Sequence, residues 1–283
     1  MAKYVTVQVT RKEPPGAPEV AGERCKKCGR PLAEGELEAS LQVCPHCAHH
    51  YLVPAHTRVA QLADPGTVTF FAEELRPTDP LEFYDTKPYP ERVSEAQLET
   101  GLTESLLAAT CKIEKIPVAL GVMEFRFLGG SMGSVMGERF WRLAQVAIVE
   151  RRAMVVVVTS GGARMQESLV SLMQMAKTIV AARILAEARL PFVTVLTHPT
   201  TGGVFASLAT VADVIMAEPG AVMQFAGRRI IEQTTREKLP SDFGSSESQV
   251  RHGQVDMVVD RRELKSRLAW TLRLLGGFGI DGD

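Results

Sequence analysis

Four cysteines in two closely spaced pairs constrain this 283-residue chain more than any other feature of its sequence. Cys25-Lys-Lys-Cys28 is followed, after fifteen residues, by Cys44-Pro-His-Cys47. Two residues between thiols let both sulfurs face one ion, and the C-x2-C-x15-C-x2-C spacing is typical of tetrahedral zinc sites. Four thiolates fill the coordination shell and leave no position for water. We therefore predict a zinc ribbon over residues 24–50 in which the Zn²⁺ is structural.

Two disulfides, or four separate core thiols, are the alternative interpretation of the same cysteines. The first residues, MAKYVTVQVTRKEPPG, lack the apolar core and the small-residue cleavage site of a secretory signal. The longest wholly apolar run, Ala153–Val158, is too short to cross a bilayer. We therefore expect a cytoplasmic protein with no membrane segment, and a reducing compartment favours metal ligands over disulfides. We expect the fifth cysteine, Cys111, to be a small buried hydrophobic residue.

Composition and charge exclude several partners. Hydrophobic residues make up 45% and charged residues 23%, as in soluble globular proteins. The 32 basic and 33 acidic residues give a net charge of −1, so nothing draws the whole chain to nucleic acid or to an anionic membrane. A nucleic-acid-binding ribbon remains an alternative function, but residues 24–58 show no clean basic face. That segment mixes Arg24, Lys26, Lys27, Arg30 and Arg58 with Glu34, Glu36 and Glu38.

The order of patterns along the chain predicts four regions. Residues 1–23 are proline-rich and are expected to form a poorly ordered leader, residues 24–50 the ribbon, and residues 51–93 a connector. Residues 94–283 alternate strands with helices, which predicts an α/β domain. Ser94 and Gln97 form a capping box that predicts a helix beginning there. We expect strands at 68–71, 106–113, 118–125, 154–158, 192–196, 213–217, 222–225 and 257–259. We expect further helices at 58–63, 134–152, 166–189, 204–210 and 263–275.

Three glycine-rich turns follow apolar segments: Gly129–Ser134, Ser160–Arg164 and Pro199–Gly203. The last two each join a strand to a helix, so unpaired backbone N–H groups lie at the positive end of a helix dipole. Any one of them is adequately explained as a tight connection, whereas three in one domain favour an anion-stabilising site. No Walker A loop is present. We therefore expect chemistry based on amide donors rather than on a side-chain nucleophile.

The longer motifs are similar to a known family. The chain contains GGSMGSV (129–135), SGGARMQE (160–167), SLMQMAKT (171–178), LPFVTVLTHPTTGGV (190–204), FAGRRIIEQTTREKLP (225–240) and HGQVDMVV (252–259), with LQVCPHC (41–47) in the cysteine region. Together these motifs resemble the β subunit of bacterial acetyl-CoA carboxylase carboxyltransferase. The resemblance runs from Cys25 to the last predicted helix, which is nearly the whole chain.

The resemblance implies an α/β fold, a crotonase-like (ClpP/crotonase) spiral of ββα units behind an N-terminal four-cysteine zinc ribbon. It implies a carboxyltransferase N-type, acyl-CoA-binding domain over residues 94–283. The family reaction moves the carboxyl group of carboxybiotin, held on a biotin carboxyl carrier protein, to acetyl-CoA and gives malonyl-CoA for fatty-acid biosynthesis. A separate carboxyltransferase α subunit completes the site, in an expected α2β2 hetero-oligomer. ATP is used by a partner biotin carboxylase.

The same resemblance implies roles for individual residues. The amides of Gly202 and Gly203 would form an oxyanion hole for the thioester enolate. The segment of Ser160, Gly161, Gly162, Ala163 and Arg164 would line the acyl or pantetheine channel. Candidates for contacts with the CoA phosphates are Arg164, Arg228, Arg229 and Lys238. His198 stands where the family leads us to expect an acidic or amide residue, and we expect no catalytic role for it.

A different acyl-CoA enzyme on the same spiral remains an alternative, either a hydratase or a malonate decarboxylase subunit. A hydratase needs acid–base carboxylates over the thioester, and none stands out among the motifs. The zinc ribbon also disfavours a hydratase. The choice of acetyl-CoA over propionyl-CoA depends on the resemblance alone.

Overall fold

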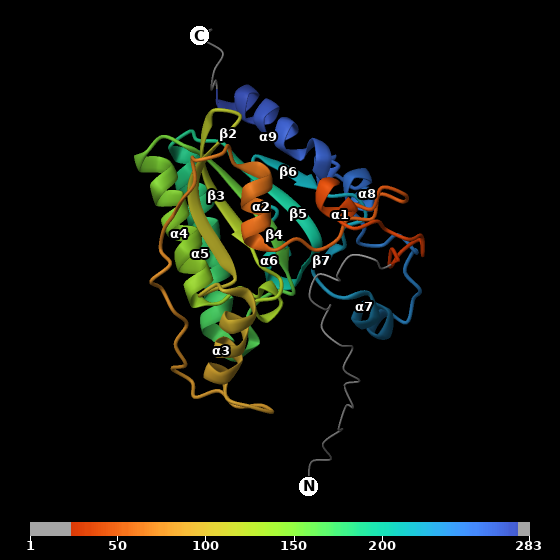
Figure 1. The fold of residues 1–283 in the computed structure, drawn as a ribbon. Helices are drawn as coiled ribbons and strands as arrows, with labels where there is room; N and C mark the ends of the chain where they lie inside the picture. Colours follow the sequence, from red (N-terminus) through yellow and green to blue (C-terminus); the bar gives the residue numbers. More distant parts are fainter. Residues whose placement is uncertain (1–23, 277–283) are drawn as a thin grey trace.

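The computed structural model describes residues 24–276, so the leader predicted for residues 1–23 lies outside the described part of the chain. One sheet organises this part, with strand order β1-β2-β3-β4-β5-β6-β8 and with β7 paired to β5 (Figure 1). Its strands are β1 (Thr69–Phe70), β2 (Leu106–Ile113), β3 (Ile116–Met123), β4 (Ala153–Ser160), β5 (Phe192–Thr201), β6 (Val214–Ala217), β7 (Met223–Gln224) and β8 (Met257–Val258). All eight predicted strands are present, and β5 is longer than expected.

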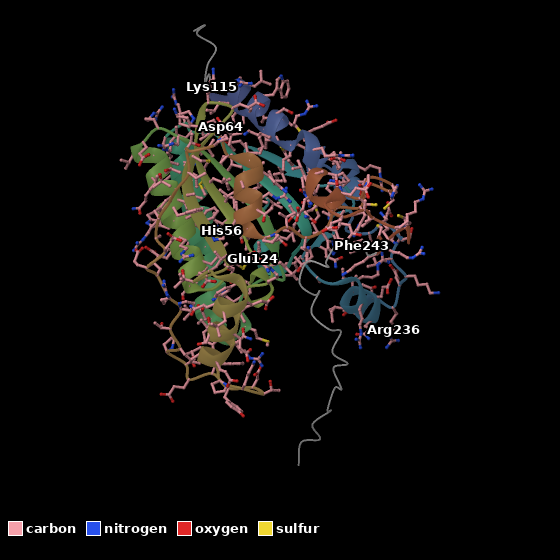
Figure 2. All side chains as sticks on the ribbon, viewed as in Figure 1. His56, Asp64, Lys115, Glu124, Arg236 and Phe243 are labelled. Carbon is pink, nitrogen blue, oxygen red and sulfur yellow. The ribbon has the colours of Figure 1, made fainter. Side chains whose placement is uncertain are left out.

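The sheet is mixed. β1, β2 and β3 are antiparallel, whereas β3, β4, β5, β6 and β8 run parallel, so their carboxyl ends share one edge. Glu114 and Lys115 form the β2–β3 turn with φ of 44° and 71°. The carboxylate of Asp64 accepts the N–H groups of both residues, with N···O distances of 3.1 and 2.7 Å. Asp64 and Lys115 lie together at that end of the molecule (Figure 2).

Helices cover both faces of the sheet. α4 (Ser134–Val149) and α5 (Ser168–Glu187) lie on one face, and α2 (Ala55–Leu62), α3 (Tyr89–Thr100) and α9 (Arg261–Gly276) lie on the other (Figure 1). Alternate residues of β4 serve the two cores: Val155 and Val157 pack with α2 and α9, while Met154, Val156 and Val158 pack with α4. Burial on both faces explains why this parallel strand is apolar throughout. The α/β architecture predicted from the sequence is confirmed.

The predicted start of one helix is wrong. α3 begins at Tyr89, directly after Pro88, and Ser94 lies inside it with its hydroxyl donating to the carbonyl of Pro90 at 2.9 Å. Proline is well tolerated in a first helical turn, because its missing N–H has no partner there anyway. Tyr89 is buried and anchors this turn to the domain. The capping-box pattern at Ser94 is therefore coincidental, and the helix includes five residues assigned to the connector.

The sequence analysis also missed three short helices, α1 (Glu36–Ala39), α7 (Arg228–Thr235) and α8 (Ser246–Arg251). α7 protrudes from the body of the domain in Figure 1, and none of its residues is buried. The helix predicted at 204–210 is shorter, as α6 (Gly202–Phe205). α6 begins directly at the end of β5, at the carboxyl edge of the sheet.

A buried ion cluster joins the ribbon to the α/β domain. The Arg261 guanidinium donates to the carbonyls of Leu41 and Gln42, both at 3.1 Å, and to the carboxylate of Glu218. Arg58, on α2, forms an ion pair with the same carboxylate, with 2.8 Å between Arg58 Nη2 and Glu218 Oε1. Burial alone would raise the pKa of Glu218, but Arg58 and Arg261 lower it to about 2. The ribbon is thus held by charge-assisted hydrogen bonds that are removed from water.

Candidate active site and metal centre

The four predicted metal ligands converge. The Sγ atoms of Cys25, Cys28, Cys44 and Cys47 lie within 4.8 Å of one another, and Cys25 Sγ lies 3.7 Å from Cys47 Sγ. Tetrahedral zinc with bonds of about 2.3 Å places its sulfur ligands about 3.8 Å apart. All four thiols are free, so the disulfide alternative is not realised. The cluster has the spacing and chemistry of a metal site.

Local backbone geometry brings the thiols together. The N–H of Gly29 donates to the carbonyl of Cys25 at 2.8 Å, and the N–H of Ala48 donates to the carbonyl of Cys44 at 2.9 Å, so each pair occupies the same kind of tight turn. Burial would raise the pKa of Cys25, but hydrogen bonds from the Tyr51 hydroxyl and from nearby backbone N–H groups lower it to about 6. Burial and the neighbouring thiols raise the pKa of Cys47 to about 12. A cation bound among the four sulfurs would be needed to keep all of them deprotonated at this spacing.

The three glycine turns meet at the carboxyl edge of the parallel strands. The N–H of Gly161 donates to Gly129 at 2.8 Å, and the N–H of Met132 donates to Gly162 at 2.9 Å, which joins the first two turns. The Thr201 hydroxyl donates to the carbonyl of Ser160 at 3.1 Å, which joins the second turn to the third. Ligands of open α/β sheets bind outside the carboxyl ends of the strands. The sequence-predicted acyl segment and oxyanion turn are therefore neighbours.

The two glycines predicted to stabilise an oxyanion are not equivalent. Gly202 has φ of 62°, and a Cβ there would lie 3.0 Å from the Cα of Gly162, so only glycine fits. The N–H of Gly202 already donates to the carbonyl of Phe225 at 3.1 Å. Gly203 lies in the first turn of α6, whose N–H groups have no acceptor within the helix. An incoming anion would therefore meet the amide of Gly203 rather than that of Gly202.

Arg164 lies in the core and not on the surface of the acyl segment. Its guanidinium forms a fork with the carboxylate of Glu104, with Nη1 to Oε2 at 2.8 Å, and also contacts Glu167 at 3.3 Å. Its side chain is 0% exposed. The burial and pairing of this guanidinium remove Arg164 from the residues able to contact a CoA phosphate. Sequence reasoning missed Glu104 and Glu167, because neither belongs to a recognisable motif of acidic residues.

Residues 129–133 read G-x-S-x-G, the spacing of some nucleophilic serines. Ser131 is buried, and its Oγ accepts a hydrogen bond from Arg164 Nε at 3.1 Å. Its carbonyl accepts from Arg164 Nη2 at 2.9 Å. The hydroxyl is thus committed to the core, so the turn positions backbone and does not present a nucleophile.

The remaining basic candidates lie on the segment that carries α7. Arg228 closes the base of this segment, because its guanidinium donates to the carbonyls of Leu239, at 2.9 Å, and Ser241, at 3.2 Å. Arg229 and Lys238 are exposed. Arg236 ends the helix at the outer limit of the molecule (Figure 2). The segment follows Phe225, whose carbonyl accepts from Gly202, so it connects directly to the oxyanion turn.

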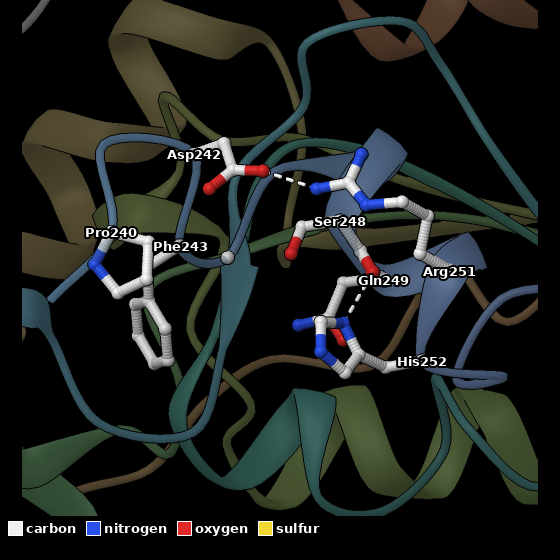
Figure 3. Close-up of a pocket in the computed structure, with 8 residues that line it drawn as sticks. Pro240, Asp242, Phe243, Ser248, Gln249, Arg251 and His252 are labelled. Carbon is white, nitrogen blue, oxygen red and sulfur yellow. Dashed lines mark hydrogen bonds and ion pairs between the residues drawn. The ribbon is translucent and has the colours of Figure 1, made fainter.

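A separate cavity of about 260 Å³ lies between the base of this segment and α8 (Figure 3). Its walls include an ion pair between Asp242 and Arg251 and the ring of His252, whose Nδ1 is 2.7 Å from the carbonyl of Ser248. None of the residues predicted for the active site lines it. The cavity is therefore distinct from the glycine turns.

His198 precedes the oxyanion turn and supports the backbone. Its side chain is exposed, but partial desolvation by the surrounding protein lowers its pKa, and its Nδ1 accepts the N–H of Val222 at 3.3 Å. Because Nδ1 is the acceptor, the neutral ring in this arrangement has its proton on Nε2. Asparagine has a side-chain oxygen that accepts the same kind of hydrogen bond. An amide residue at position 198 could therefore accept the same N–H of Val222 as His198 does.

Comparison with known proteins agrees with this geometry. The family of carboxyl transferase domains matches residues 85–272. The acetyl-coenzyme A carboxylase carboxyl transferase subunit β of a Thermus thermophilus strain is 52% identical over 270 residues, covering 94% of each chain. The subunit of the same name from Parasynechococcus marenigrum is 48% identical over 253 residues, covering 89% of this chain and 86% of the relative.

Solved structures show the same fold at low sequence identity. Transcarboxylase 12S, crystallised with methylmalonyl-coenzyme A, superposes with a TM-score of 0.64 at 22% identity, covering 78% of this chain and 41% of that one. A Pseudomonas malonate decarboxylase hetero-dimer gives 0.60 at 18% identity, covering 78% and 86%. The expected crotonase-like carboxyltransferase fold is confirmed. Identity of about half over nearly the full length of the relatives places the chain in the family of acetyl-CoA carboxylase carboxyl transferase β subunits.

Proposed function

We propose that this chain moves the carboxyl group of carboxybiotin, held on a biotin carboxyl carrier protein, to acetyl-CoA and so forms malonyl-CoA for fatty-acid biosynthesis. The observation that carries the proposal is the junction of the acyl segment with the Gly202–Gly203 turn, in a chain about half identical to named carboxyltransferase subunits. Carboxybiotin supplies the carboxyl group and the base for the α-proton, so the chain needs no general base of its own. ATP is used by the partner biotin carboxylase.

The task of the chain is to stabilise the enolate oxygen of the thioester. In the proposed site, the N–H of Gly203 donates to that oxygen at the N-terminus of α6, where the backbone dipoles favour negative charge. Gly202 contributes its left-handed conformation, which turns the chain from β5 into α6. A preorganised donor needs no rearrangement during the reaction, and its removal typically costs about 3–4 kcal/mol of barrier.

We place the acyl chain and pantetheine of acetyl-CoA along Ser160, Gly161, Gly162 and Ala163. Ser160 ends β4, and the residues after it face the oxyanion turn: a Cβ at Gly203 would lie 3.7 Å from Ala163 Cβ. The CoA phosphates would then meet Arg229 and Lys238 on the exposed segment. Arg228 would not contact the phosphates itself. Its hydrogen bond to the carbonyl of Leu239 holds together the two ends of the segment that carries Arg229 and Lys238.

We propose that the four-cysteine cluster holds a structural Zn²⁺. All four positions of a tetrahedral ion are filled by protein thiolates, which leaves none for substrate or water. The charge cluster around Arg261 connects the ribbon to the sheet. Zinc therefore stabilises the ribbon and its attachment and takes no part in carboxyl transfer.

The outer face of α5 indicates a partner. The inner side of its first half carries buried Ser171, Gln174 and Thr178, and apolar Ala181 and Leu185 are buried farther along, whereas larger apolar side chains face outward. The exposed apolar residues of α5 are Leu169, Val170, Leu172, Met173, Ile179 and Val180, and Met165 is exposed just before the helix. By length and composition the segment Met165–Glu187 could also span a bilayer, and it is the one such segment between residues 24 and 276. Its inner side packs on the domain.

Since α5 directly follows the acyl segment, we propose that the carboxyltransferase α subunit covers this face. The α subunit would complete the biotin side of the site within an α2β2 assembly. Membership of the family implies a complex with the other acetyl-CoA carboxylase subunits, and we place that complex in the cytoplasm.

Reconstitution tests this function. The purified chain, the α subunit and a carboxylated carrier protein are mixed with acetyl-CoA, and malonyl-CoA is measured by mass spectrometry. We expect product only when both subunits are present. Full activity of this chain alone would refute the division of the site between subunits. A kcat/KM for propionyl-CoA tenfold above that for acetyl-CoA would refute the proposed substrate.

A further inference from the structure

A second charge cluster lies beneath the acyl segment, apart from the one that holds the ribbon. It consists of Arg164, Glu104, Glu167 and Tyr89, all buried, from three separate places in the sequence, since Arg164 and Glu167 are three residues apart. We call it the Arg164 cluster. The mechanism proposed above uses none of its side chains, because all four are buried.

The Arg164 cluster is fully hydrogen-bonded. The Arg164 fork holds both oxygens of Glu104, and its Nη1 lies 3.1 Å from the Tyr89 hydroxyl. The same hydroxyl donates to Glu167 at 2.6 Å. The second oxygen of Glu167 accepts the N–H of Ser134 at 2.6 Å, at the start of α4. Two carboxylates against one guanidinium would leave a net negative charge, and the positive end of this sixteen-residue helix offsets it.

This arrangement connects two of the three glycine turns through one side chain. Arg164 ends the acyl segment, and it donates through Nε and Nη2 to the side chain and carbonyl of Ser131 in the first turn. Gly133 must be glycine for the same reason: a Cβ there would lie 2.5 Å from a Glu167 oxygen and 2.7 Å from Arg164 Nη1. The guanidinium therefore adds a side-chain link to the backbone hydrogen bonds that already join these two turns.

The position of the acyl segment in turn sets its fit to the oxyanion turn. A Cβ at Gly162 would lie 3.3 Å from Gly202 Cα and 3.5 Å from Gly203 N, so the two backbones are in contact. A shift of the acyl segment moves the thioester relative to the Gly203 amide. Misplacement of about 1 Å costs about 10²-fold in rate.

We infer that Arg164 is a positioning residue, which aligns the acyl segment with the Gly203 amide through its fork to Glu104. This inference rests on the proposed carboxyltransferase function. It replaces the phosphate contact expected from the sequence with a role inside the core. A lysine keeps the charge but presents a point charge instead of a planar fork, so it cannot hold Glu104 and Ser131 together.

The test compares Arg164→Lys with Arg261→Lys, because both arginines are buried and paired to a glutamate, but Arg261 holds the ribbon. Each variant is assayed with the α subunit and the carboxylated carrier. We expect both to lower Tm, and only Arg164→Lys to lower kcat, by about 10²-fold with KM for acetyl-CoA within about threefold of wild type. If Arg164→Lys keeps wild-type kcat, or raises only KM, the inference is wrong. Equal losses of kcat in both variants would also overturn it.

Amide hydrogen exchange gives a readout that does not depend on activity. We expect faster exchange in Arg164→Lys at residues 129–133 and 160–164, with the ribbon unchanged, and the reverse in Arg261→Lys. Unchanged exchange in those two turns would contradict the inference. Absence of carboxyl transfer by the wild-type complex would instead count against the proposed function, and the exchange experiment would still test the inference. If Arg164→Lys does not fold, Glu104→Gln replaces it, because this change keeps the size of the side chain and removes the charge that the fork binds.

Discussion

Gly203 shows how closely single residues are fitted at this site. A Cβ there would lie 3.0 Å from Met175 Sδ and 3.7 Å from Ala163 Cβ, on the side where the thioester is proposed to lie. We predict that Gly203→Val lowers kcat by about 10²-fold or more in the assembled enzyme, because it displaces the substrate from one well-aimed donor. Steady-state assays with acetyl-CoA check this, with zinc content and Tm unchanged.

Two further single substitutions are controls for Gly203→Val. Gly227→Ala adds a methyl group where no atom lies within 4 Å, so its kcat should match wild type. His198→Asn should keep most activity, because the amide oxygen replaces Nδ1 as the acceptor for the N–H of Val222. A folded His198→Asn variant with no activity, or a Gly203→Val variant near wild type, would show that the chemistry lies elsewhere.

The ribbon is the element with the clearest independent test. We predict one zinc per chain, lost in Cys44→Ala and retained in Cys111→Ala, as measured by elemental analysis. The Cys44 and Cys111 thiols are equally buried, so a difference in zinc content between the two variants reports loss of a ligand and not loss of packing. Burial raises the pKa of Cys111 to about 12, which keeps it a neutral thiol in the core.

Loss of the metal should also destabilise the α/β domain. Structural zinc contributes about 10–16 kcal/mol in model peptides. Without it, the carbonyls of Leu41 and Gln42 no longer have fixed positions, and Arg261 loses two buried acceptors. Tm should therefore fall in Cys44→Ala by more than in Cys111→Ala. Equal zinc content in the two variants would refute the ligand assignment.

At the scale of the whole molecule, the exposed apolar face of α5 makes association testable. We predict that Leu172→Glu weakens binding of the α subunit at least tenfold, because it places an unpaired charge in an apolar interface. Analytical ultracentrifugation of the mixed subunits measures this. Leu98→Glu is the matched control: Leu98 is equally apolar and 88% exposed, but it lies on α3. Binding lost equally in both variants, or in neither, would exclude α5 as the contact.

Local patterns predicted much of this protein. The cysteine spacing predicted the metal cluster, and alternating apolar segments predicted every strand, because both signals act over a few neighbouring residues. The glycine turns were found for the same reason, since a tight connection between strand and helix needs glycine at specific positions. The helix α7 was missed although its apolar residues lie on one side, because a pattern over only 8 residues is too short to identify a helix.

Only the tertiary structure determined which partner each polar group has, and therefore which role it can take. Ser94 looked like a cap, but the helix starts at Tyr89, whose hydroxyl bonds Glu167 across 78 residues of sequence. Arg164 looked like a phosphate ligand, but Glu104, 60 residues away, holds it in the core. The Gly202 amide donates to the carbonyl of Phe225, so the proposed contact with the thioester oxygen is assigned to Gly203. Spacing along the chain determines which local structure a segment adopts, whereas a polar group's role depends on partners that only folding brings within hydrogen-bond distance.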